Sequence, residues 1–177
     1  MKYNVILADP PWSFKTWSDK GKGWSADNHY NVMSIDDIKA LPVPAADNCA
    51  LFLWVTFPLL RGGLEVMEAW GFDYRTQGFT WVKQNKKSDS LFWGMGYYTR
   101  ANAELCLLGV KGRMPVEDRG VHSVIWSPVR EHSRKPDEQY ERIERLYPGA
   151  NYLEMFARYK RDGWDSWGNE VDSDIAL

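Results

Sequence analysis

Hydrophobic residues along this chain gather in short uninterrupted runs, which are separated by polar and irregular stretches. The runs Val5–Ala8 and Ala50–Val55 consist of apolar residues only. Runs of this length with β-branched members are typical of strands that are buried on both faces of a sheet. Further strands are predicted at Gly78–Lys83, Glu104–Val110, Val121–Trp126 and Asn151–Ala157.

Capping residues and helical spacing predict three helices between these strands. Ser34, with an acidic residue three positions later, marks the start of a short helix. The segment Thr56–Trp70 has apolar residues at helical spacing and ends on Gly71, a residue suited to a C-terminal cap. Gly62–Gly63 in its middle indicates a close contact between helix and sheet. A third helix is predicted over Asp137–Leu146.

The order of these elements predicts the fold class. Strands and helices alternate along the whole chain, which indicates an α/β protein with three layers and a mainly parallel sheet. The sequence contains no internal repeat, low-complexity segment or linker, so we expect residues 1–177 to form a single domain. The acidic tail from about residue 171 is expected to be disordered.

The most distinctive polar feature, Asp9-Pro10-Pro11-Trp12, directly follows the first strand. Proline cannot donate to a β-ladder, so the strand ends here and Asp9 lies at its carboxyl end, where open α/β sheets place ligands. Asp9 and the Pro10 carbonyl can accept both hydrogens of an amino group, while Trp12 can stack on the base that carries it. The motif suggests methyl transfer to an exocyclic amine. A strand-ending turn with Trp12 in the core explains the four residues equally well.

Two long irregular stretches, Ser13–Tyr30 and Lys83–Arg100, mix lysines with aromatic residues. Basic side chains can contact phosphates and aromatic rings can stack on bases, so both stretches are candidates for binding nucleic acid. The first stretch follows the Asp9 motif and suggests a loop that closes over a substrate. Charged surface loops with a few anchoring aromatic residues explain the same composition.

A single carboxylate, Glu154, interrupts the last apolar run of the chain. A buried carboxylate is costly unless it is paired or binds a ligand. Arg158, on the same side of the predicted strand, is a candidate partner in a purely structural ion pair. The cationic segment Arg130–Lys135 comes shortly before, ahead of the third helix.

Overall composition excludes several classes of protein. The formal net charge of −2 argues against binding nucleic acid through bulk charge, so such binding needs a local basic patch or a partner chain. Cys49 and Cys106 lie far apart in apolar runs, which indicates buried free thiols in a reducing cytoplasm. The histidines form no ligand cluster, no stretch is long enough to span a membrane, and no targeting signal is visible. We therefore expect a cytoplasmic protein without a metal site or membrane association.

Several segments together resemble the MT-A70 family of adenine-N6 methyltransferases. The resemblance extends over nearly the whole chain, in order and with similar spacing. The matching segments are Asp9–Trp12, Tyr30, Met33–Ser34, Leu51–Thr56, Trp81–Lys83, Leu107–Gly112, Lys135–Glu138, Ile143–Leu146, Pro148–Gly149, Leu153–Arg158 and Trp167–Glu170.

This resemblance implies a Rossmann-like methyltransferase fold with a circularly permuted order of motifs and S-adenosylmethionine as methyl donor. The implied catalytic residues are Asp9, Pro10, Pro11 and Trp12; the implied donor-binding residues are Asp9, Lys135, Glu154, Phe156, Arg158, Asn169 and Glu170; those near the acceptor are Trp12, Tyr30, Lys83, Arg100 and Glu104. Cations suit the methionine carboxylate of the donor, and acidic and amide groups suit its ribose hydroxyls. The chain departs from eukaryotic members in beginning close to the first strand and in having Glu170 where the eukaryotic enzyme has Gln.

The run Gly94–Arg100 resembles bacterial and phage members, which implies methylation of adenine N6 in DNA, on a base that is flipped or unpaired. The same chemistry on RNA is an alternative, because no feature reads the 2′-hydroxyl. Another alternative is a non-catalytic partner subunit that only presents nucleic acid. The expected partners are nucleic acid, with DNA favoured over RNA, and a second copy of the chain or a second methyltransferase-like subunit.

Overall fold

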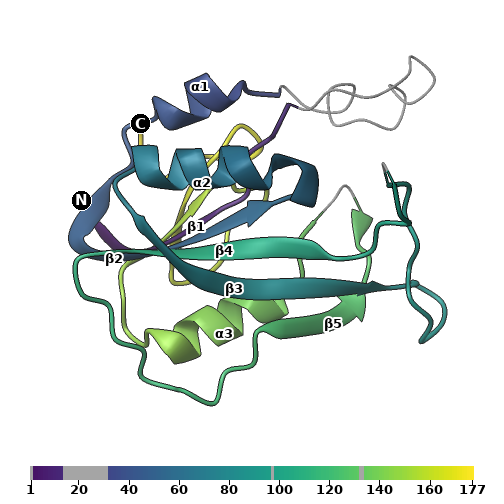
Figure 1. Ribbon diagram of the computed structural model, residues 1–177. Coiled ribbons are helices and arrows are strands. Elements are labelled where there is room, and N and C mark those ends of the chain that lie inside the picture. Colours follow the sequence, from purple (N-terminus) through teal and green to yellow (C-terminus); the bar gives the residue numbers. More distant parts are fainter. Residues whose placement is uncertain (1, 14–31, 97, 132–133) are drawn as a thin grey trace.

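The computed structural model describes residues 2–13, 32–96, 98–131 and 134–177, and these residues form an α/β structure around one seven-stranded sheet (Figure 1). In chain order the elements are β1 (Tyr3–Ala8), α1 (Ile35–Lys39), β2 (Ala45–Val55), the 3-10 helix η3 (Phe57–Leu59), α2 (Leu60–Ala69), β3 (Asp73–Gln84), β4 (Glu104–Lys111), β5 (Val124–Pro128), α3 (Glu138–Leu146), β6 (Tyr152–Met155) and β7 (Trp164–Trp167). The strands are arranged in the order β5-β3-β4-β2-β1-β6-β7. The predicted α/β class is confirmed.

The sheet is mainly parallel, as the sequence predicts. β1 pairs in parallel with β2 on one side and with β6 on the other, and the pairs β6–β7 and β3–β5 are also parallel. β4 runs in the opposite direction, between β2 and β3. The carboxyl ends of β1, β2 and β6 therefore lie at the same edge of the sheet, which is the edge where open α/β sheets bind ligands.

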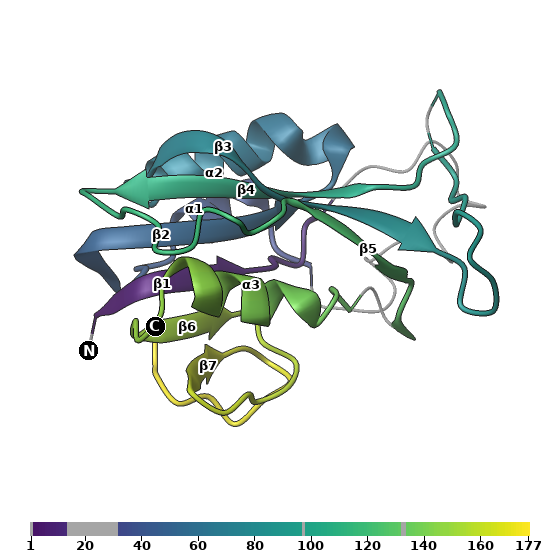
Figure 2. The same ribbon diagram turned by 90° about the horizontal axis from the view of Figure 1, so that it is seen from below.

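Helices lie on both faces of the sheet, with α1 and α2 on one face and α3 on the other (Figures 1 and 2). Because successive side chains of a strand point to opposite faces, Ile6 of β1 joins Ile38 and Met67 in one core, while Leu7 joins Ile143 in the other. These five side chains are at most 2% exposed. Burial on both faces explains the unbroken apolar runs Val5–Ala8 within β1 and Ala50–Val55 within β2.

The three predicted helices are confirmed as α1, α2 and α3, but strands and helices do not alternate along the whole chain. Among the described residues, the connection from β3 to β4 contains no helix, since the two strands are antiparallel neighbours and need no crossover. Residues 156–163, between β6 and β7, also lack a helix. β3 starts at Asp73, earlier than predicted, because its exposed first part is held by pairing with β4 rather than by an apolar pattern. β6 ends earlier than predicted, because Phe156 has a φ of 63° and leaves the extended conformation.

The predicted helix over residues 56–70 begins as η3 and continues as α2. Gly71 has a φ of 81°, which confirms it as the C-terminal cap residue. A Cβ atom added to Gly63 would lie 3.0 Å from the Val55 side chain of β2, so the predicted close helix–sheet contact is confirmed there. At Gly62 the added atom would instead meet Ile35 of α1.

The acidic tail packs against the rest of the chain, which contradicts the expected disorder. The Asp174 carboxylate accepts hydrogen bonds from the backbone N–H and the hydroxyl of Ser166 at 2.9 and 2.8 Å, and pairs with Lys160 at 2.6 Å. Ile175 and Leu177 are partly buried against the core on the α1–α2 side of the sheet. The prediction of disorder was based on the acidic composition of the tail, and composition does not indicate that Ile175 and Leu177 pack against the core or that Asp174 has specific partners.

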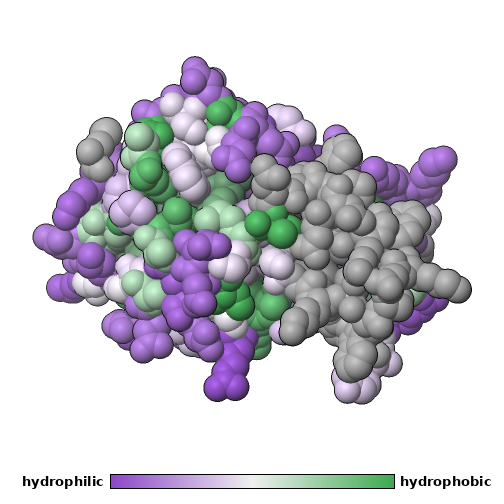
Figure 3. Space-filling view, turned by 90° about the horizontal axis from the view of Figure 1, so that it is seen from above, coloured by the Kyte–Doolittle hydropathy of each residue, from purple (hydrophilic) through white to green (hydrophobic). Residues whose placement is uncertain are grey.

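The surface over α1 and α2 mixes hydrophilic and hydrophobic residues (Figure 3). Leu60 and Leu64 of α2 are partly buried and pack at the margin of the core. Cys49 and Cys106 are buried free thiols, as predicted. Within the described ranges, no helix has the length and apolar character needed to cross a membrane.

Gly168, directly after β7, generates a prediction about stability. A Cβ atom at this position would lie 2.4 Å from the Ala157 carbonyl oxygen and 2.7 Å from the Ala157 nitrogen. Both are backbone atoms, so Gly168→Ala must displace the turn after β6 and is expected to lower the free energy of unfolding by about 1–3 kcal/mol. Urea denaturation measures this change. The control is Gly120→Ala, whose added atom would meet only the Asp118 side chain at 3.1 Å; equal losses in both variants would refute the close packing at Gly168.

Candidate active site

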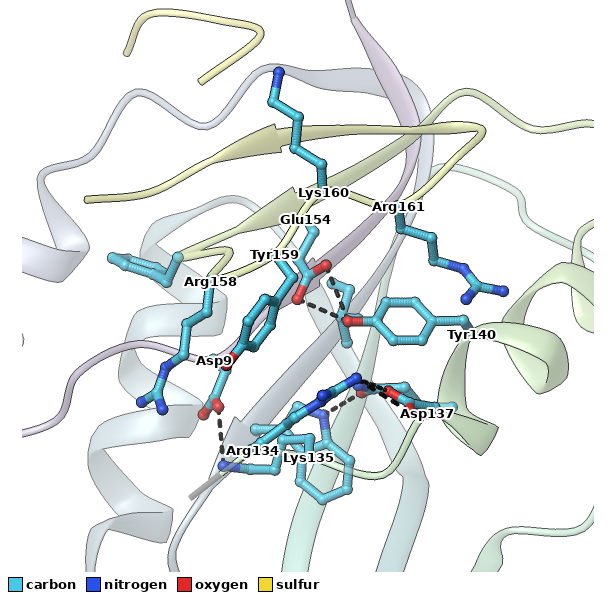
Figure 4. Close-up of a pocket in the computed structure, with 14 residues that line it drawn as sticks. Asp9, Arg134, Lys135, Asp137, Tyr140, Glu154, Arg158, Tyr159, Lys160 and Arg161 are labelled. Atoms are coloured by element: carbon cyan, nitrogen blue, oxygen red, sulfur yellow. Dashed lines mark hydrogen bonds and ion pairs between the residues drawn. The ribbon is translucent and has the colours of Figure 1, made fainter. Parts of the chain in front are cut away.

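Asp9 lies immediately after β1, between the carboxyl ends of β2 and β6. Its carboxylate accepts a hydrogen bond from the Lys135 ammonium, with an Oδ2–Nζ distance of 2.9 Å (Figure 4). The following turn is held by its own backbone: the Pro10 carbonyl accepts the Trp12 N–H at 2.8 Å, and the Pro11 carbonyl accepts the Met33 N–H at 3.0 Å. The prolines therefore end the strand where the sequence predicted, and they leave Asp9 beside Lys135.

Trp12 lies in the core, with 6% of its surface exposed. Its indole N–H donates to the Trp54 carbonyl oxygen at 2.9 Å. In this arrangement the ring anchors the Asp9 turn and presents little area to a base. The position of Trp12 agrees with the second interpretation of the motif, a strand-ending turn with Trp12 in the core.

Four charged side chains of alternating sign form a row that ends at Asp9. The Lys135 ammonium also lies 3.1 Å from the Glu104 carboxylate, and Glu104 in turn lies 2.5 Å from the Lys83 ammonium. The Lys135 side chain is 9% exposed and lies over the Trp54 ring, 5.6 Å from its centroid. Lys83, predicted to contact phosphate, is thus held inside a partly buried cluster.

Burial and charge act against each other in this row. Burial raises the pKa of Asp9, and the Lys135 ammonium offsets only part of that rise. Burial also acts to raise the pKa of Glu104, but Lys135 and Lys83 outweigh it and hold this pKa at about 2. For Lys135, burial acts to lower the pKa, while Asp9 and Glu104 raise it well above its usual value. Glu104 is therefore a permanent anion and Lys135 a permanent cation at neutral pH.

A cavity of about 240 Å³ lies beside Asp9, between the carboxyl ends of β1 and β6 and the start of α3 (Figure 4). Its lining is dominated by charged and aromatic side chains. The lining residues are Leu7, Asp9, Trp54, Arg134, Lys135, Asp137, Gln139, Tyr140, Glu154, Phe156, Arg158, Tyr159, Lys160 and Arg161.

The wall of the cavity at β6 combines a shifted carboxyl group with an unusual backbone conformation. Burial raises the pKa of Glu154 to about 7, although the hydroxyl of Tyr140 donates to both of its carboxylate oxygens at 3.0 Å. Phe156 is the non-glycine residue with positive φ among those the structure describes. Such backbone strain concentrates at functional sites. The Arg158 guanidinium forms an ion pair with the Glu170 carboxylate at 3.5 Å.

The structure brings most of the predicted donor-binding residues together. Asp9, Lys135, Glu154, Phe156 and Arg158 all line the cavity, although they come from opposite ends of the chain. Two other predicted residues, Asn169 and Glu170, are exposed and do not line it, although the Glu170 carboxylate lies 3.5 Å from Arg158, which does.

The residues predicted near the acceptor are more scattered. Glu104 lies in the charged row with Lys83, and Arg100 is exposed on the connection between β3 and β4. Tyr30, and nearly all of the predicted covering loop Ser13–Tyr30, lie outside the described residues.

Sequence reasoning did not assign several residues of the cavity wall to the site. These are Leu7, Trp54, Arg134, Asp137, Gln139, Tyr140, Tyr159, Lys160 and Arg161. The cluster of basic residues that follows β6 was a usable signal, because it comes directly after the strand that carries Glu154. The α3 residues gave no such signal, since Tyr140 fits an ordinary apolar helix face.

A mainly parallel sheet between helices, with a carboxylate beside a charged cavity at the carboxyl ends of central strands, is consistent with a methyltransferase-like enzyme. Comparison with known proteins identifies the family: the chain belongs to the MT-A70 family of adenine-N6 methyltransferases, whose model matches residues 3–170. The resemblance seen in the sequence is thereby confirmed.

Individual relatives differ greatly in length. The chain is 32% identical to the type II methyltransferase M.MunI of Mycoplasma sp, over 96% of this chain and 78% of that protein. It is 37% identical to a putative N(6)-adenosine-methyltransferase MT-A70-like protein of Medicago truncatula and 34% identical to the human N(6)-adenosine-methyltransferase catalytic subunit METTL3. These two alignments cover 96% and 97% of this chain but only 26% and 28% of the relatives, so the chain spans about a quarter of their length.

The charged row generates a prediction about stability and pH. Lys135→Met leaves Asp9 and Glu104 without the cation that faces both, and is expected to cost about 3–5 kcal/mol at neutral pH. The loss should shrink on acidification. The pKa of Asp9 is already raised and rises further without Lys135, and a carboxyl group with a raised folded-state pKa contributes stability that is lost as the pH rises through that value.

Urea denaturation at pH 5 and pH 8 tests this prediction. The matched control is Lys39→Met, which breaks a 4.0 Å surface ion pair with Asp36 and is expected to cost less than about 0.5 kcal/mol at either pH. A loss for Lys135→Met that is small, or identical at the two pH values, would contradict the assigned role of the buried cation.

Proposed function

We propose that this chain transfers a methyl group from S-adenosylmethionine to the exocyclic amine of adenine in DNA. The observation that carries the proposal is the position of the Asp9 carboxylate, at the edge of a cavity whose far wall is formed by β6 and the turn after it. Methyltransferases of this family use S-adenosylmethionine.

The cavity wall suits the chemistry of this methyl donor. The donor carries a carboxylate, cationic groups and ribose hydroxyls, and the wall offers cations, carboxylates and an aromatic ring within one cavity. Lys135 and Arg158 would face the donor carboxylate, Glu154 would accept from ribose hydroxyls, and Phe156 would supply apolar contact. Asn169 and Glu170 would complete the site through a rearrangement next to Arg158. When bound, the donor would supply an electrophilic methyl group: the bond from the amine nitrogen to the methyl carbon would form as the bond from that carbon to the donor sulfur breaks. The neutral thioether would leave, and the methylated amine would release one proton.

Asp9 and the Pro10 carbonyl would act on the acceptor. An amine nitrogen of adenine is a poor nucleophile because its lone pair is conjugated with the ring. A carboxylate and a carbonyl that accept both of its hydrogens would turn the lone pair out of conjugation and toward the methyl group. The Pro10 carbonyl already accepts the Trp12 N–H, which leaves its second lone pair for the amine. Pro11 and Trp12 would keep this turn in place, so preorganised electrostatics supplies much of the acceleration.

Lys135 would keep Asp9 in its active state. The carboxylate must be ionised to accept hydrogens from the amine, and its burial opposes ionisation. The ammonium at 2.9 Å favours the ionised form, and Glu104 on the other side of Lys135 holds that ammonium in place. Glu104 would therefore support the acceptor site through Lys135.

The connection between β3 and β4 is our candidate for contact with nucleic acid, and it extends beyond the end of the sheet (Figure 2). It exposes Trp93, Met95 and Tyr98, with 57%, 89% and 96% of their surface accessible. The same connection also exposes two lysines and an arginine, Lys86, Lys87 and Arg100. Aromatic and basic side chains in one loop suit bases and phosphates.

DNA is favoured over RNA by the likeness to the Mycoplasma type II methyltransferase, which this chain matches over most of the length of both proteins. The likeness to N(6)-adenosine methyltransferases keeps RNA as the second candidate. One of those relatives is a catalytic subunit by name, which supports a second methyltransferase-like subunit, or a second copy of this chain, as partner. The position of β1 between β2 and β6 is compatible with a circularly permuted order of motifs.

The acceptor site predicts that Asp9→Ala loses methyl transfer by at least about a thousandfold, while binding of S-adenosylmethionine largely persists. Radiolabelled methyl incorporation and calorimetry measure the two properties. Mass spectrometry of genomic DNA from cells that express the wild type or the variant provides the corresponding cellular test. Near-normal transfer by the variant would refute the role of Asp9, and failure of the wild type to bind the donor would favour a non-catalytic subunit.

Competition between matched DNA and RNA oligonucleotides distinguishes the two substrates. The expected result is preferential methylation of adenine N6 in the DNA, with the product identified by mass spectrometry after nucleoside digestion. Preferential methylation of the RNA would refute DNA as the substrate and support RNA instead.

The candidate nucleic-acid loop predicts a change in salt dependence. If Lys86 and Lys87 contact phosphates, replacing both by alanine should lower the slope of log affinity against log salt by about 2 and weaken binding of all sequences alike. Fluorescence anisotropy with labelled DNA over a salt series measures this slope. Lys39→Ala, which removes a lysine of α1, is the control. An unchanged slope in the double variant would exclude this loop from the interface.

A further inference from the structure

Tyr140 connects α3 to the wall of the cavity at β6. It belongs to α3, and its hydroxyl crosses to Glu154 of β6, where it lies 3.0 Å from each carboxylate oxygen (Figure 4). A single hydroxyl proton is thus shared between two acceptors. This bond holds the carboxylate in one orientation and leaves lone pairs of both oxygens for another partner.

The ring of Tyr140 is itself held by two neighbours. The Trp164 ring packs edge-on against it at a centroid distance of 5.4 Å, and the Arg161 guanidinium lies 4.6 Å from its centroid. Both neighbours contact the Glu144 carboxylate, Trp164 through its indole N–H at 2.8 Å and Arg161 at 3.4 Å. Glu144 lies one helical turn after Tyr140 on α3. The ring that carries this hydroxyl is therefore held by Trp164 of β7 and by Arg161 of the connection between β6 and β7.

Removing this hydroxyl would change the state of Glu154. The groups that face this carboxylate come from every element around it: Tyr140 on α3, Asp9 after β1, Arg134 before α3 and Arg161 after β6. Burial and Asp9 raise its pKa, while the Tyr140 hydrogen bond, Arg161 and Arg134 lower it, with a result of about 7. Of the effects that lower the pKa of Glu154, the hydrogen bond from Tyr140 is the largest.

We propose that Tyr140 is a positioning residue of the methyl-donor pocket, whose hydroxyl orients Glu154 and keeps it available as an anionic acceptor for the hydroxyl groups of the donor ribose. This inference rests on the proposed function, because it takes Glu154 to bind the donor. It assigns Tyr140 no contact with the reacting atoms. The consequence is that Tyr140 affects the donor affinity and its pH dependence, and does not affect the methyl-transfer step.

The test compares Tyr140→Phe with Tyr152→Phe. Tyr152 lies on the same strand as Glu154, and its hydroxyl donates to the Tyr147 carbonyl at 2.6 Å, outside the cavity. Calorimetry with S-adenosylmethionine between pH 5.5 and 9 is expected to show about tenfold weaker binding for Tyr140→Phe at pH 7, with the acidic loss of affinity displaced upward by about one pH unit. Tyr152→Phe should bind like the wild type. At saturating donor, the turnover number of Tyr140→Phe should stay close to the wild-type value while KM for the donor rises.

Glu154→Gln supplies an independent arm that does not require Tyr140→Phe to fold. Wild-type affinity for the donor should fall as the pH drops below about 7, and this dependence should vanish in Glu154→Gln, whose amide does not titrate. Adding Tyr140→Phe to Glu154→Gln should then weaken binding far less than in the wild type.

The possible failures separate the two proposals. Wild-type binding of the donor together with equal behaviour of the two tyrosine variants, or with a pH dependence that survives in Glu154→Gln, would overturn the role of Tyr140 and leave the proposed function standing. No binding of the donor by the wild type at any pH would overturn the proposed function and this inference together.

Discussion

The ion pair between Asp9 and Lys135 is the interaction on which the arrangement of the site depends. It joins the residue after the first strand to Lys135, which lies three positions before the start of α3, across 126 positions of sequence. The Lys135 side chain is 9% exposed and that of Asp9 28%, so each charge stabilises the other in a partly dry environment. Glu104 adds a second anion to the same ammonium, and Lys83 neutralises Glu104 in turn. The result is a row of charges that fixes the position and ionisation of the carboxylate at the edge of the cavity.

The sheet explains how such a row can form. β1 lies between β2 and β6, so the carboxyl end of the first strand is next to that of a strand near the end of the chain. β4 runs antiparallel to β2, which brings Glu104, at its amino end, to the same edge of the sheet. One edge thereby collects Asp9 after β1, Lys83 of β3, Glu104 of β4 and Glu154 of β6. The positive φ of Phe156 ends β6 beside the cavity, and the absence of a side chain at Gly168 lets the chain after β7 pack closely on the backbone of Ala157.

Much of the fold follows from local patterns in the sequence. The unbroken apolar run of β1 and the apolar end of β2 predict strands that are buried on both faces, and Gly71 predicts the end of α2, since these signals depend on nearby residues only. Predictions failed where long-range pairing decides the outcome. β3 begins at polar Asp73 because β4 pairs with it, and the tail packs because Asp174 meets Ser166 and Lys160. Neither partner can be read from the local composition.

By itself, the sequence determined the family, the class of fold and the presence of a carboxylate at the end of the first strand. These are encoded in short segments whose chemistry is visible residue by residue. Tertiary structure alone decided that Trp12 is a buried anchor, that Lys83 neutralises Glu104, and that Tyr140 holds Glu154. An aromatic ring or a lysine has the same local pattern whether it packs in a core, pairs with a buried charge or meets a ligand. Its role is determined by which distant side chains the sheet brings within a few ångströms of it.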